Sequence, residues 1–448
     1  NVDGALNRNA TSRANQNGPA SYGFRGNARN LDLNRDYVKQ DSRNARSFAA
    51  LFRRWQPDVF VDTHTSNGAD YPYTLTLIAT QKDKLAPALS EYLTQRLLPA
   101  LSAGMARRNT PLTPYVDFEG RTPDARGLVG FLETPRYSTG YTTLFNTLGF
   151  VTETHMLKAY APRVRATYDF LDVLLRFVHT DAPALTLARA DAARRLSEQV
   201  IFPLAWRLDT TVAAKVSFRG YAGKTRPSEV SGQPRLYYDR NAPFTRPLPY
   251  YNTYRPTVTA TRPRAYLIPQ AWGEVLDRLR AAGVPLQRLT RDTTLTAEVY
   301  YIDDYKTSPR PYEGHYPHSA VTVRPTQQAL PYRRGDYVAR LDNATARFLL
   351  ETLEPQATDS FFAWGFFDSI LQQKEHFSDY VFEEVAADLL RQDPALRGRL
   401  EKLKQQNPVF AASGAAQLEW VYRQSGHYEP THLRYPVARW LGGALPAE

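Results

Sequence analysis

The sequence predicts an α/β protein in which a mainly parallel mixed sheet with flanking helices precedes a β-rich and then a mainly helical accessory region. Three observations support this class. Over about the first 180 residues, short apolar runs alternate with stretches whose apolar residues recur at helical spacing. Residues 207–270 are rich in Pro, Tyr and β-branched residues, which is typical of strands joined by irregular loops. From residue 341 onward, helical patterns predominate.

The elements of the first region follow from apolar spacing. Phe48, Phe52 and Trp55 recur on one helical face, and Pro57 ends that helix. Leucines recur every four residues from Leu85 to Leu101, which predicts a long amphipathic helix. The complete expectation is helices over 44–55, 85–101, 161–178 and 183–200, with strands over 58–64, 74–80 and 149–154.

The later elements are expected from the same signals. A helix begins near 269 and ends at Gly283, and strands follow it, including 297–302. The pattern of 371–392 predicts a helix. Since composition changes near 180–205 and more gradually near 305–335, we divide the chain into residues 1–181, 182–335 and 336–448.

Composition excludes several classes of protein. A chain of 448 residues without cysteine has two or three domains and no disulfide, thiolate metal site or thiol nucleophile. Its net charge of +11 is spread without a basic block, so we expect no nucleic-acid partner. No apolar run is long enough for a membrane span, and no G-x-S-x-G motif indicates a serine hydrolase.

His64 and Glu153 both lie where a predicted strand ends. In open α/β sheets, ligands bind at the carboxyl ends of the strands, so the two side chains are expected to face one crevice. Glu153 and His155 would share a face of their strand. The structural alternatives are a strand that reaches the surface and a hydrogen-bonded bystander histidine.

Two further segments offer guanidinium groups for anionic oxygens. Arg13 lies in SRANQNG, and the pair Asn34 and Arg35 lies in NLDLNRDY. The alternation in LDLNRDY predicts a strand edge that turns into a loop, from which Arg35 would project into the crevice. The alternative is a surface ion pair between Arg35 and Asp32 or Asp36, which would contribute little.

In combination, these motifs resemble the zinc carboxypeptidase family of carboxypeptidases A and B. The order is N-x-D-G at 1–4, an arginine, N-R after D-L, an isolated histidine ending a strand, and a glutamate ending a later strand. NLDLNRDY, DTHTSNGADY and ETHMLKAY are most similar to large bacterial members. The resemblance covers about residues 1–180 and implies that 1–181 is the C-terminal part of the catalytic domain. The remainder resembles the C-terminal extension of those proteins.

The resemblance implies a role for each matching residue. His64 would be the third zinc ligand, and Glu153 the general base and acid that activates a zinc-bound water. Asn34 and Arg35 would hold the terminal carboxylate of the substrate. Arg13 would polarise the scissile carbonyl.

Two of these assignments have a competing residue. Arg8 is the alternative to Arg13 for the arginine that polarises the carbonyl. Tyr137 is the preferred candidate for the mobile catalytic tyrosine of the family. Tyr141 is the second tyrosine candidate, which would contact substrate.

One feature of the family is missing. Its first two zinc ligands come from an H-x-x-E motif upstream of N-x-D-G, and none of the eight histidines here has Glu three residues later. Since the chain opens at Asn1 with N-x-D-G itself, we expect truncation rather than loss of function. As given, the chain would hold Zn²⁺ weakly through His64 and be inactive.

The expected function is that of a zinc metallocarboxypeptidase acting on peptide or protein C-termini, and the resemblance implies export to the periplasm or the extracellular space. One alternative is a catalytically inactive relative that binds peptide or glycan, although retention of Glu153 argues against it. The other is a zinc amidohydrolase acting on cell-wall peptides.

Overall fold

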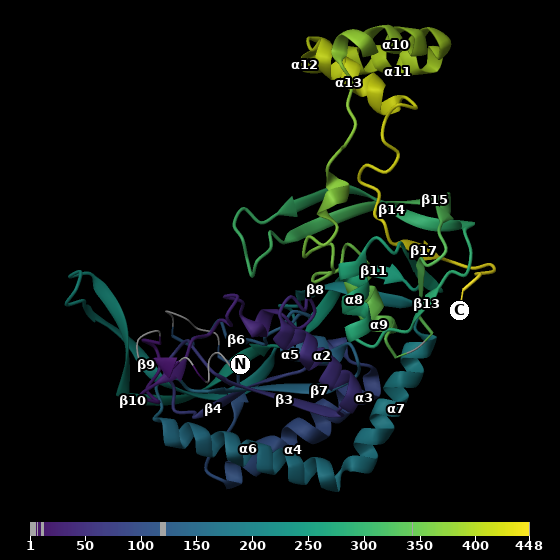
Figure 1. The fold of residues 1–448 in the computed structure, drawn as a ribbon. Coiled ribbons are helices and arrows are strands. Elements are labelled where there is room, and N and C mark those ends of the chain that lie inside the picture. The colour runs from purple at the N-terminus through teal and green to yellow at the C-terminus, as the bar shows by residue number, and fades with distance from the viewer. Residues whose placement is uncertain (1–5, 7, 10–12, 117–121, 343, 448) are drawn as a thin grey trace.

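A four-stranded mixed sheet forms the centre of the first region in the computed structural model, which describes residues 6, 8–9, 13–116, 122–342 and 344–447 (Figure 1). The strand order is β3-β7-β4-β5. β3 and β7 are parallel, β4 is antiparallel to β7, and β5 is parallel to β4. The bounds are β3 (Val59–Thr65), β7 (Leu148–Thr154), β4 (Leu75–Ala79) and β5 (Thr113–Pro114). The predicted mixed sheet with flanking helices is confirmed.

Helices cover both faces of this sheet. Figure 1 shows α4 and α6 below it and α2 and α5 above it. The helices of this region are α2 (Arg43–Trp55), α3 (Pro87–Glu91), the π-helix η3 (Tyr92–Leu97), α4 (Leu98–Arg107), α5 (Ser138–Thr143), α6 (Tyr160–Thr180) and α7 (Ala182–Glu198). The leucine stripe from Leu85 to Leu101 faces the core, but a π-turn interrupts the expected helix.

Helix α2 illustrates how local sequence sets an element. The Ser42 hydroxyl accepts a hydrogen bond from the Ala45 N–H at 3.0 Å, and the helix ends where Gln56 adopts a left-handed conformation. Ala49 and Phe52 are buried on the face that meets the core. The predicted helix is therefore right to within one residue at its start.

Short elements connect these layers. They are β1 (Arg8–Asn9), β2 (Tyr22–Gly23), the 3₁₀ helices η1 (Leu33–Arg35) and η2 (Lys82–Lys84), and β6 (Leu128–Val129). The strand edge expected in LDLNRDY is wrong. Asp32 accepts a hydrogen bond from the Asn34 N–H at 3.0 Å and caps η1 instead, because an Asp side chain competes for local backbone donors.

The β-rich region contains a long antiparallel hairpin of β9 (Ala214–Pro227) and β10 (Pro234–Tyr251), seen at the left of Figure 1. β10 also pairs with β6 of the first region. A second antiparallel pair is β8 (Ile201–Leu208) with β11 (Tyr254–Thr261).

A six-stranded sheet of order β13-β16-β12-β17-β14-β15 follows. Its strands are β12 (Ala265–Ile268), β13 (Leu286–Arg288), β14 (Thr293–Thr307), β15 (His318–Tyr332), β16 (Tyr337–Arg340) and β17 (Ala438–Trp440). The associated helices are α8 (Gly273–Ala281), α9 (Ala346–Leu353) and the 3₁₀ helix η4 (Asp368–Leu371). Because β17 comes from the chain end, this sheet joins both accessory regions.

Four helices form a separate module that projects from the six-stranded sheet (Figure 1). They are α10 (Asp379–Gln392), α11 (Pro394–Gln406), α12 (Pro408–Ala411) and α13 (Gly414–Gln424). We call residues 377–428 the helical module. The helix expected over 371–392 begins later, because the Glu429 carboxylate binds the N–H groups of Lys374 and Glu375 and holds that segment extended.

Packing crosses both predicted region boundaries. Leu185 and Ala188 of α7 belong to the same hydrophobic cluster as Leu75 and Phe150 of the first sheet. A larger cluster joins Phe52 of α2 with residues of α8, α9 and β16. Separately, no helix in the described part of the chain is long and apolar enough to span a bilayer.

Candidate active site

The two residues predicted at strand ends are neighbours. β3 and β7 pair in register so that His64 lies opposite Glu153. His64 Nδ1 is 3.6 Å from Glu153 Oε1. The parallel alignment of two strands therefore brings together side chains that are 89 positions apart in sequence, as the carboxyl-end argument predicted.

A second carboxylate holds the other side of the imidazole. His64 Nε2 is 3.0 Å from Asp62 Oδ2, and Tyr37 donates its hydroxyl to the same oxygen at 3.2 Å. Burial lowers the pKa of His64, but the contacts with Asp62 and Glu153 outweigh it and raise that pKa to about 10. In this arrangement the imidazole is a cation at neutral pH.

Asp62 was missed among the candidate residues, although a signal for it existed. It lies two positions before His64 on the same strand, so the two side chains share one face of the sheet. Tyr37 precedes α2 and had no comparable signal, since only folding brings it to Asp62.

Glu153 is a nearly buried carboxylate with unused hydrogen-bonding capacity. Its side chain is 11% exposed. Oε2 is buried, and no described group forms a hydrogen bond with it. A buried acceptor oxygen without a partner is costly, so this atom favours a ligand or water beside it.

A cleft of about 800 Å³ opens at this end of the strands. Its lining includes Arg13, Asn34, His64 and Thr154, contributed by segments that are distant in sequence, and Arg163 of α6. The cleft therefore brings together three of the residues predicted to bind substrate or metal.

Arg13 and its rival Arg8 differ in their placement. Arg13 lies on the cleft, and its backbone N–H donates to the Tyr22 hydroxyl at 3.0 Å. Arg8 lies in β1, where it pairs with Gly23. This favours Arg13. The N-x-D-G motif at 1–4 lies outside the described residues.

Arg35 lies next to Asn34 but does not contribute to the cleft lining. Its guanidinium carbon is 4.5 Å from the centroid of the Tyr137 ring. Nε donates to the Tyr312 hydroxyl at 2.9 Å, and Nη1 donates to the Asn34 carbonyl at 2.8 Å. The Asp32 carboxylate is 3.9 Å from Nη1. Among the described residues, none accepts a hydrogen bond from Nη2.

Of the two alternative ion pairs of Arg35, the one with Asp32 is formed at 3.9 Å, and the one with Asp36 is not. Asp36 is fully buried and accepts hydrogen bonds from Lys39 Nζ at 3.1 Å and from the N–H groups of Asp41 and Ser42. Asp36 therefore orders the segment before α2, and Nη2 of Arg35 remains available to another anion.

The two tyrosine candidates occupy different environments. Tyr137 is half-buried at the N-cap position of α5, beside Arg35. Tyr141 is fully buried and packs against Phe52, Phe145 and Phe348. Tyr141 has a packing role and does not line the cleft at His64, which disagrees with the expected substrate contact because a residue at 0% exposure offers no surface.

His155 has a supporting role. It is fully buried, Nε2 is 3.1 Å from Asp70 Oδ1, and the Leu157 N–H donates to Nδ1 at 3.0 Å. It ties the loop after β3 to the end of β7, next to Glu153.

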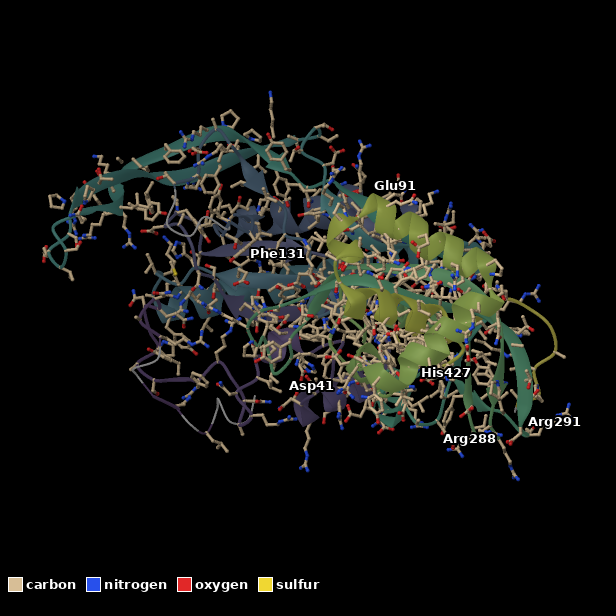
Figure 2. All side chains as sticks on the ribbon, turned by 90° about the horizontal axis from the view of Figure 1, so that it is seen from above. Asp41, Glu91, Phe131, Arg288, Arg291 and His427 are labelled. Carbon is tan, nitrogen blue, oxygen red and sulfur yellow. The ribbon has the colours of Figure 1, made fainter. Side chains whose placement is uncertain are left out.

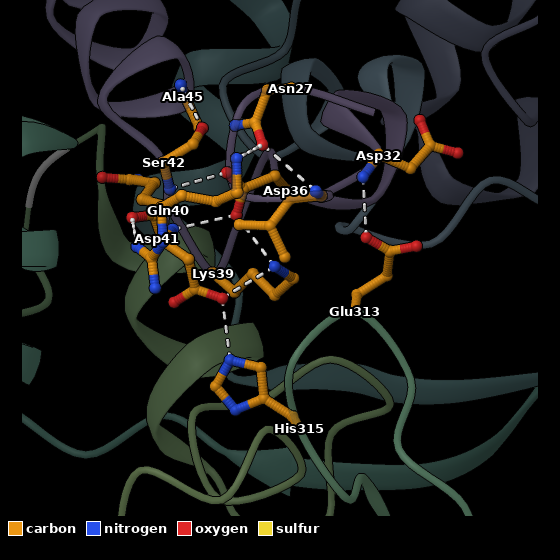
Figure 3. Close-up of polar contacts among 12 residues, drawn as sticks. Asn27, Asp32, Asp36, Lys39, Gln40, Asp41, Ser42, Ala45, Glu313 and His315 are labelled. Atoms are coloured by element: carbon orange, nitrogen blue, oxygen red, sulfur yellow. Dashed lines mark hydrogen bonds and ion pairs between the residues drawn. The ribbon is translucent and has the colours of Figure 1, made fainter. Parts of the chain in front are cut away.

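A loop from the β-rich region joins the site. Figure 3 shows Glu313 beside Asp32, the residue that caps η1, and His315 beside Asp41, which lies between η1 and α2. Glu313 Oε2 accepts from the Asp32 N–H at 2.8 Å, and His315 Nε2 is 2.7 Å from Asp41 Oδ2. Sequence reasoning missed this loop, because about 280 residues separate the partners.

The donor set does not fit a three-ligand zinc site. His64 supplies one imidazole, and its ring nitrogens face Asp62 and Glu153. Within the ranges that the structure describes, no group of three His, Cys, Asp or Glu side chains is arranged to hold a metal ion.

Comparison with known proteins finds similarity to fungal carboxypeptidases. Carboxypeptidase 2 of Trichophyton rubrum is 28% identical over 110 residues, which are 25% of this chain and 20% of that protein. Carboxypeptidase 2 of Trichophyton tonsurans is 28% identical over 108 residues, 24% of this chain and 20% of that protein. The chain thus spans about a fifth of the length of these relatives.

No family model matches the chain, and no solved structure matches it. The similarity supports a distant carboxypeptidase-like relationship over about a quarter of the chain.

Proposed function

We propose that this chain carries the base and the substrate-recognition groups of a metallocarboxypeptidase that hydrolyses C-terminal peptide bonds. The observation that carries the proposal is the pairing of His64, which lines the cleft, with Glu153, 3.6 Å apart. The carboxypeptidase-like similarity agrees with it. The substrates would be peptides or proteins with a free C-terminus.

Glu153 is the proton carrier in this proposal. A water beside Oε2 would give a proton to the carboxylate as its oxygen bonds to the scissile carbonyl carbon. When the C–N bond then breaks, the same proton passes to the departing amine nitrogen. The unpartnered Oε2 is consistent with such a water position.

Four other residues would orient the substrate. Arg35 would bind the terminal carboxylate through Nη2, with Asn34 beside it on the cleft. Arg13, which also lines the cleft, would bind the scissile carbonyl oxygen and stabilise its developing charge. Tyr137 lies near enough to Arg35 to contact the same end of the substrate.

Zinc remains a prediction within this proposal. His64 would be one ligand, and further ligands would have to come from outside the described residues, so we assign no step to the metal. Metal analysis of the 448-residue chain tests this expectation. We expect less than one zinc per chain after dialysis, and chelator-resistant stoichiometric zinc would contradict it.

The central experiment measures binding, because binding does not require a complete metal site. Calorimetry would compare a short peptide that has a free C-terminus with its C-amidated counterpart. We expect the free peptide to bind at least about tenfold more tightly than the amidated peptide, because a charge-assisted pair contributes that much. Arg35→Ala should abolish this difference in affinity.

Arg291→Ala is the matched control. Arg291 is exposed and projects from the edge of the molecule far from Asp41 (Figure 2). The substitution Arg291→Ala removes the same charge as Arg35→Ala without changing the site, so the preference for the free peptide should persist. Equal binding of both peptides by the unmodified chain would refute carboxylate recognition.

The second candidate is a catalytically inactive relative that binds peptides. The incomplete ligand set among the described residues favours it. Hydrolysis by the longest natural protein that contains this sequence, supplied with Zn²⁺, separates the two. Carboxypeptidase activity supports the first candidate, and peptide binding without turnover supports the second.

A further inference from the structure

The loop between β14 and β15 is a tight turn whose tip is held against the candidate site. The Tyr312 N–H donates to the His315 carbonyl at 2.7 Å, and the His315 N–H donates to the Tyr312 carbonyl at 3.1 Å. Between them, Glu313 and Gly314 have φ values of 51° and 81°. Two successive positive φ angles are those of a two-residue hairpin turn, in which glycine suits the second position.

Contacts of Glu313 and His315, which follow Tyr312, fix the turn to the first region. Glu313 Oε2 accepts from the Asp32 N–H at 2.8 Å, and His315 Nε2 lies 2.7 Å from Asp41 Oδ2 (Figure 3). Asp41 is in turn bound by Lys39 Nζ at 2.7 Å and by Arg278 Nη2 at 2.9 Å. The turn is therefore anchored at sites that do not involve Arg35.

The Tyr312 ring is also held independently of Arg35. It stacks on Trp364 with an interplanar angle of 17° and a centroid distance of 6.2 Å, and Trp364 is almost fully buried. The Arg136 guanidinium lies 5.6 Å from the Tyr312 centroid and is bound to Asp359. The hydroxyl of Tyr312 thus has a defined position before Arg35 is considered.

That hydroxyl sits where it can orient the Arg35 guanidinium. It accepts from Nε at 2.9 Å, while Nη1 donates to the Asn34 carbonyl at 2.8 Å and the Tyr137 ring covers one face at 4.5 Å. An arginine side chain has several freely rotating bonds, so these contacts select one orientation of its fork. Nη2 is the nitrogen that they leave for an external anion.

We propose that Tyr312 is a positioning residue for Arg35, so that the β-rich region completes the binding site for the substrate's terminal carboxylate. This inference rests on the proposed function, because it assumes that Arg35 binds that carboxylate. It assigns a role in substrate binding to a region that the family resemblance leaves without one.

The test is Tyr312→Phe in the full 448-residue chain. This change removes the hydroxyl and keeps the ring that stacks on Trp364. We expect affinity for the free-carboxylate peptide to fall about tenfold, the effect of losing one hydrogen bond to a charged group. Affinity for the amidated peptide should not change.

Tyr316→Phe is the matched control. Tyr316 lies in the same loop, and its side chain is 54% exposed. The substitution Tyr316→Phe also removes a tyrosine hydroxyl from this loop, so the affinities for both peptides should stay as in the unmodified chain. Thermal unfolding of each variant checks that the fold persists.

A double mutant separates positioning from a general structural effect. If Tyr312 acts through Arg35, Tyr312→Phe should have no further effect on the free peptide in an Arg35→Ala background. Three results would overturn the inference. The losses of affinity from Tyr312→Phe and Arg35→Ala could be additive, Tyr312→Phe could weaken binding of both peptides equally, or it could leave the affinity for the free peptide unchanged.

The outcomes also distinguish this inference from the proposed function. If the unmodified chain does not prefer the free peptide, carboxylate recognition fails and the role of Tyr312 fails with it. A different set of results refutes only the positioning role. In that case the unmodified chain prefers the free peptide and Arg35→Ala removes this preference, but Tyr312→Phe does not weaken it.

Discussion

At the scale of single residues, the imidazole of His64 has a strongly raised pKa. Its two ring nitrogens face Asp62 and Glu153, and the resulting pKa is about 10. Because the pKa of His64 is higher in the folded state than its unfolded value of about 6.5, protonation of His64 stabilises the folded protein, and this stabilisation is complete below about pH 6.5. The stabilisation is lost as the pH rises from about 6.5 through about 10.

The first prediction is that Asp62→Asn lowers the pKa of His64 by at least about one unit, because it removes the nearer opposite charge. NMR titration of the imidazole measures the shift. Asp58→Asn is the control, since Asp58 precedes the same strand and pairs with Arg189 at the surface. A His64 pKa that is equal in both variants would contradict the assigned cause.

The second prediction concerns the proposed base. Glu153→Gln keeps the shape of the side chain but cannot accept the water proton, so kcat should fall by at least about 10²-fold with little change in KM. The measurement requires an active protein that contains this chain. Unchanged turnover would reduce Glu153 to a structural strand end.

At the scale of elements, the close approach of α5 to the segment before it helps to set the site. A Cβ on Gly140 would lie 1.9 Å from the Thr134 carbonyl oxygen. Glu133 accepts hydrogen bonds from the Thr139 N–H and hydroxyl at 2.7 and 2.6 Å, which fixes the start of α5. Because Tyr137 directly precedes this helix, the position of α5 determines where its ring meets Arg35.

The third prediction is that Gly140→Ala lowers the free energy of unfolding by about 3 kcal/mol, the upper end for overpacking, since a backbone atom cannot move aside easily. Denaturant unfolding measures the change. Gly398→Ala is the control, because Gly398 lies in α11 with no atom within 4 Å of an added Cβ. That control should be neutral or slightly stabilising, as alanine favours helices. Equal stability of both variants would show that α5 can shift.

At the scale of the whole molecule, the β-rich region and the helical module differ in how they join the first region. The β-rich region shares its largest hydrophobic cluster with α2 and supplies the turn at Tyr312. The helical module has a cluster of its own around Phe382 and Tyr422, and Figure 1 shows it apart from the remainder. The first association is therefore integral to the site, and the second is peripheral to it.

The fourth prediction is that replacing the helical module by a short Gly-Ser linker leaves the rest folded. Its two ends are adjacent, since the Glu429 carboxylate binds the Lys374 N–H at 2.8 Å. The melting temperature of the remainder should change by only a few degrees, by scanning calorimetry.

The comparison for this deletion is the fragment 1–181, which should not fold. It lacks the buried face of α7, where Leu185 and Ala188 belong to the cluster beneath the first sheet. A stable fragment, or a deletion variant that unfolds, would contradict this account of the packing.

The amino-acid sequence by itself determined the elements whose causes are local. The apolar spacing of Phe48, Phe52 and Trp55 predicted α2, and the strand ends at His64 and Glu153 predicted that these two side chains lie at the same end of the sheet. These predictions succeed because helix and strand periods, and the geometry of parallel strands, depend on neighbouring residues.

Only the tertiary structure decided the contacts between distant segments. The burial of Tyr141 among aromatic rings and the contact of Tyr312 with Arg35 had no signal in local pattern. Tyr312 and Arg35 are 277 positions apart in sequence. Whether two such side chains meet depends on how whole layers of the structure pack, and a short window of sequence does not contain that information.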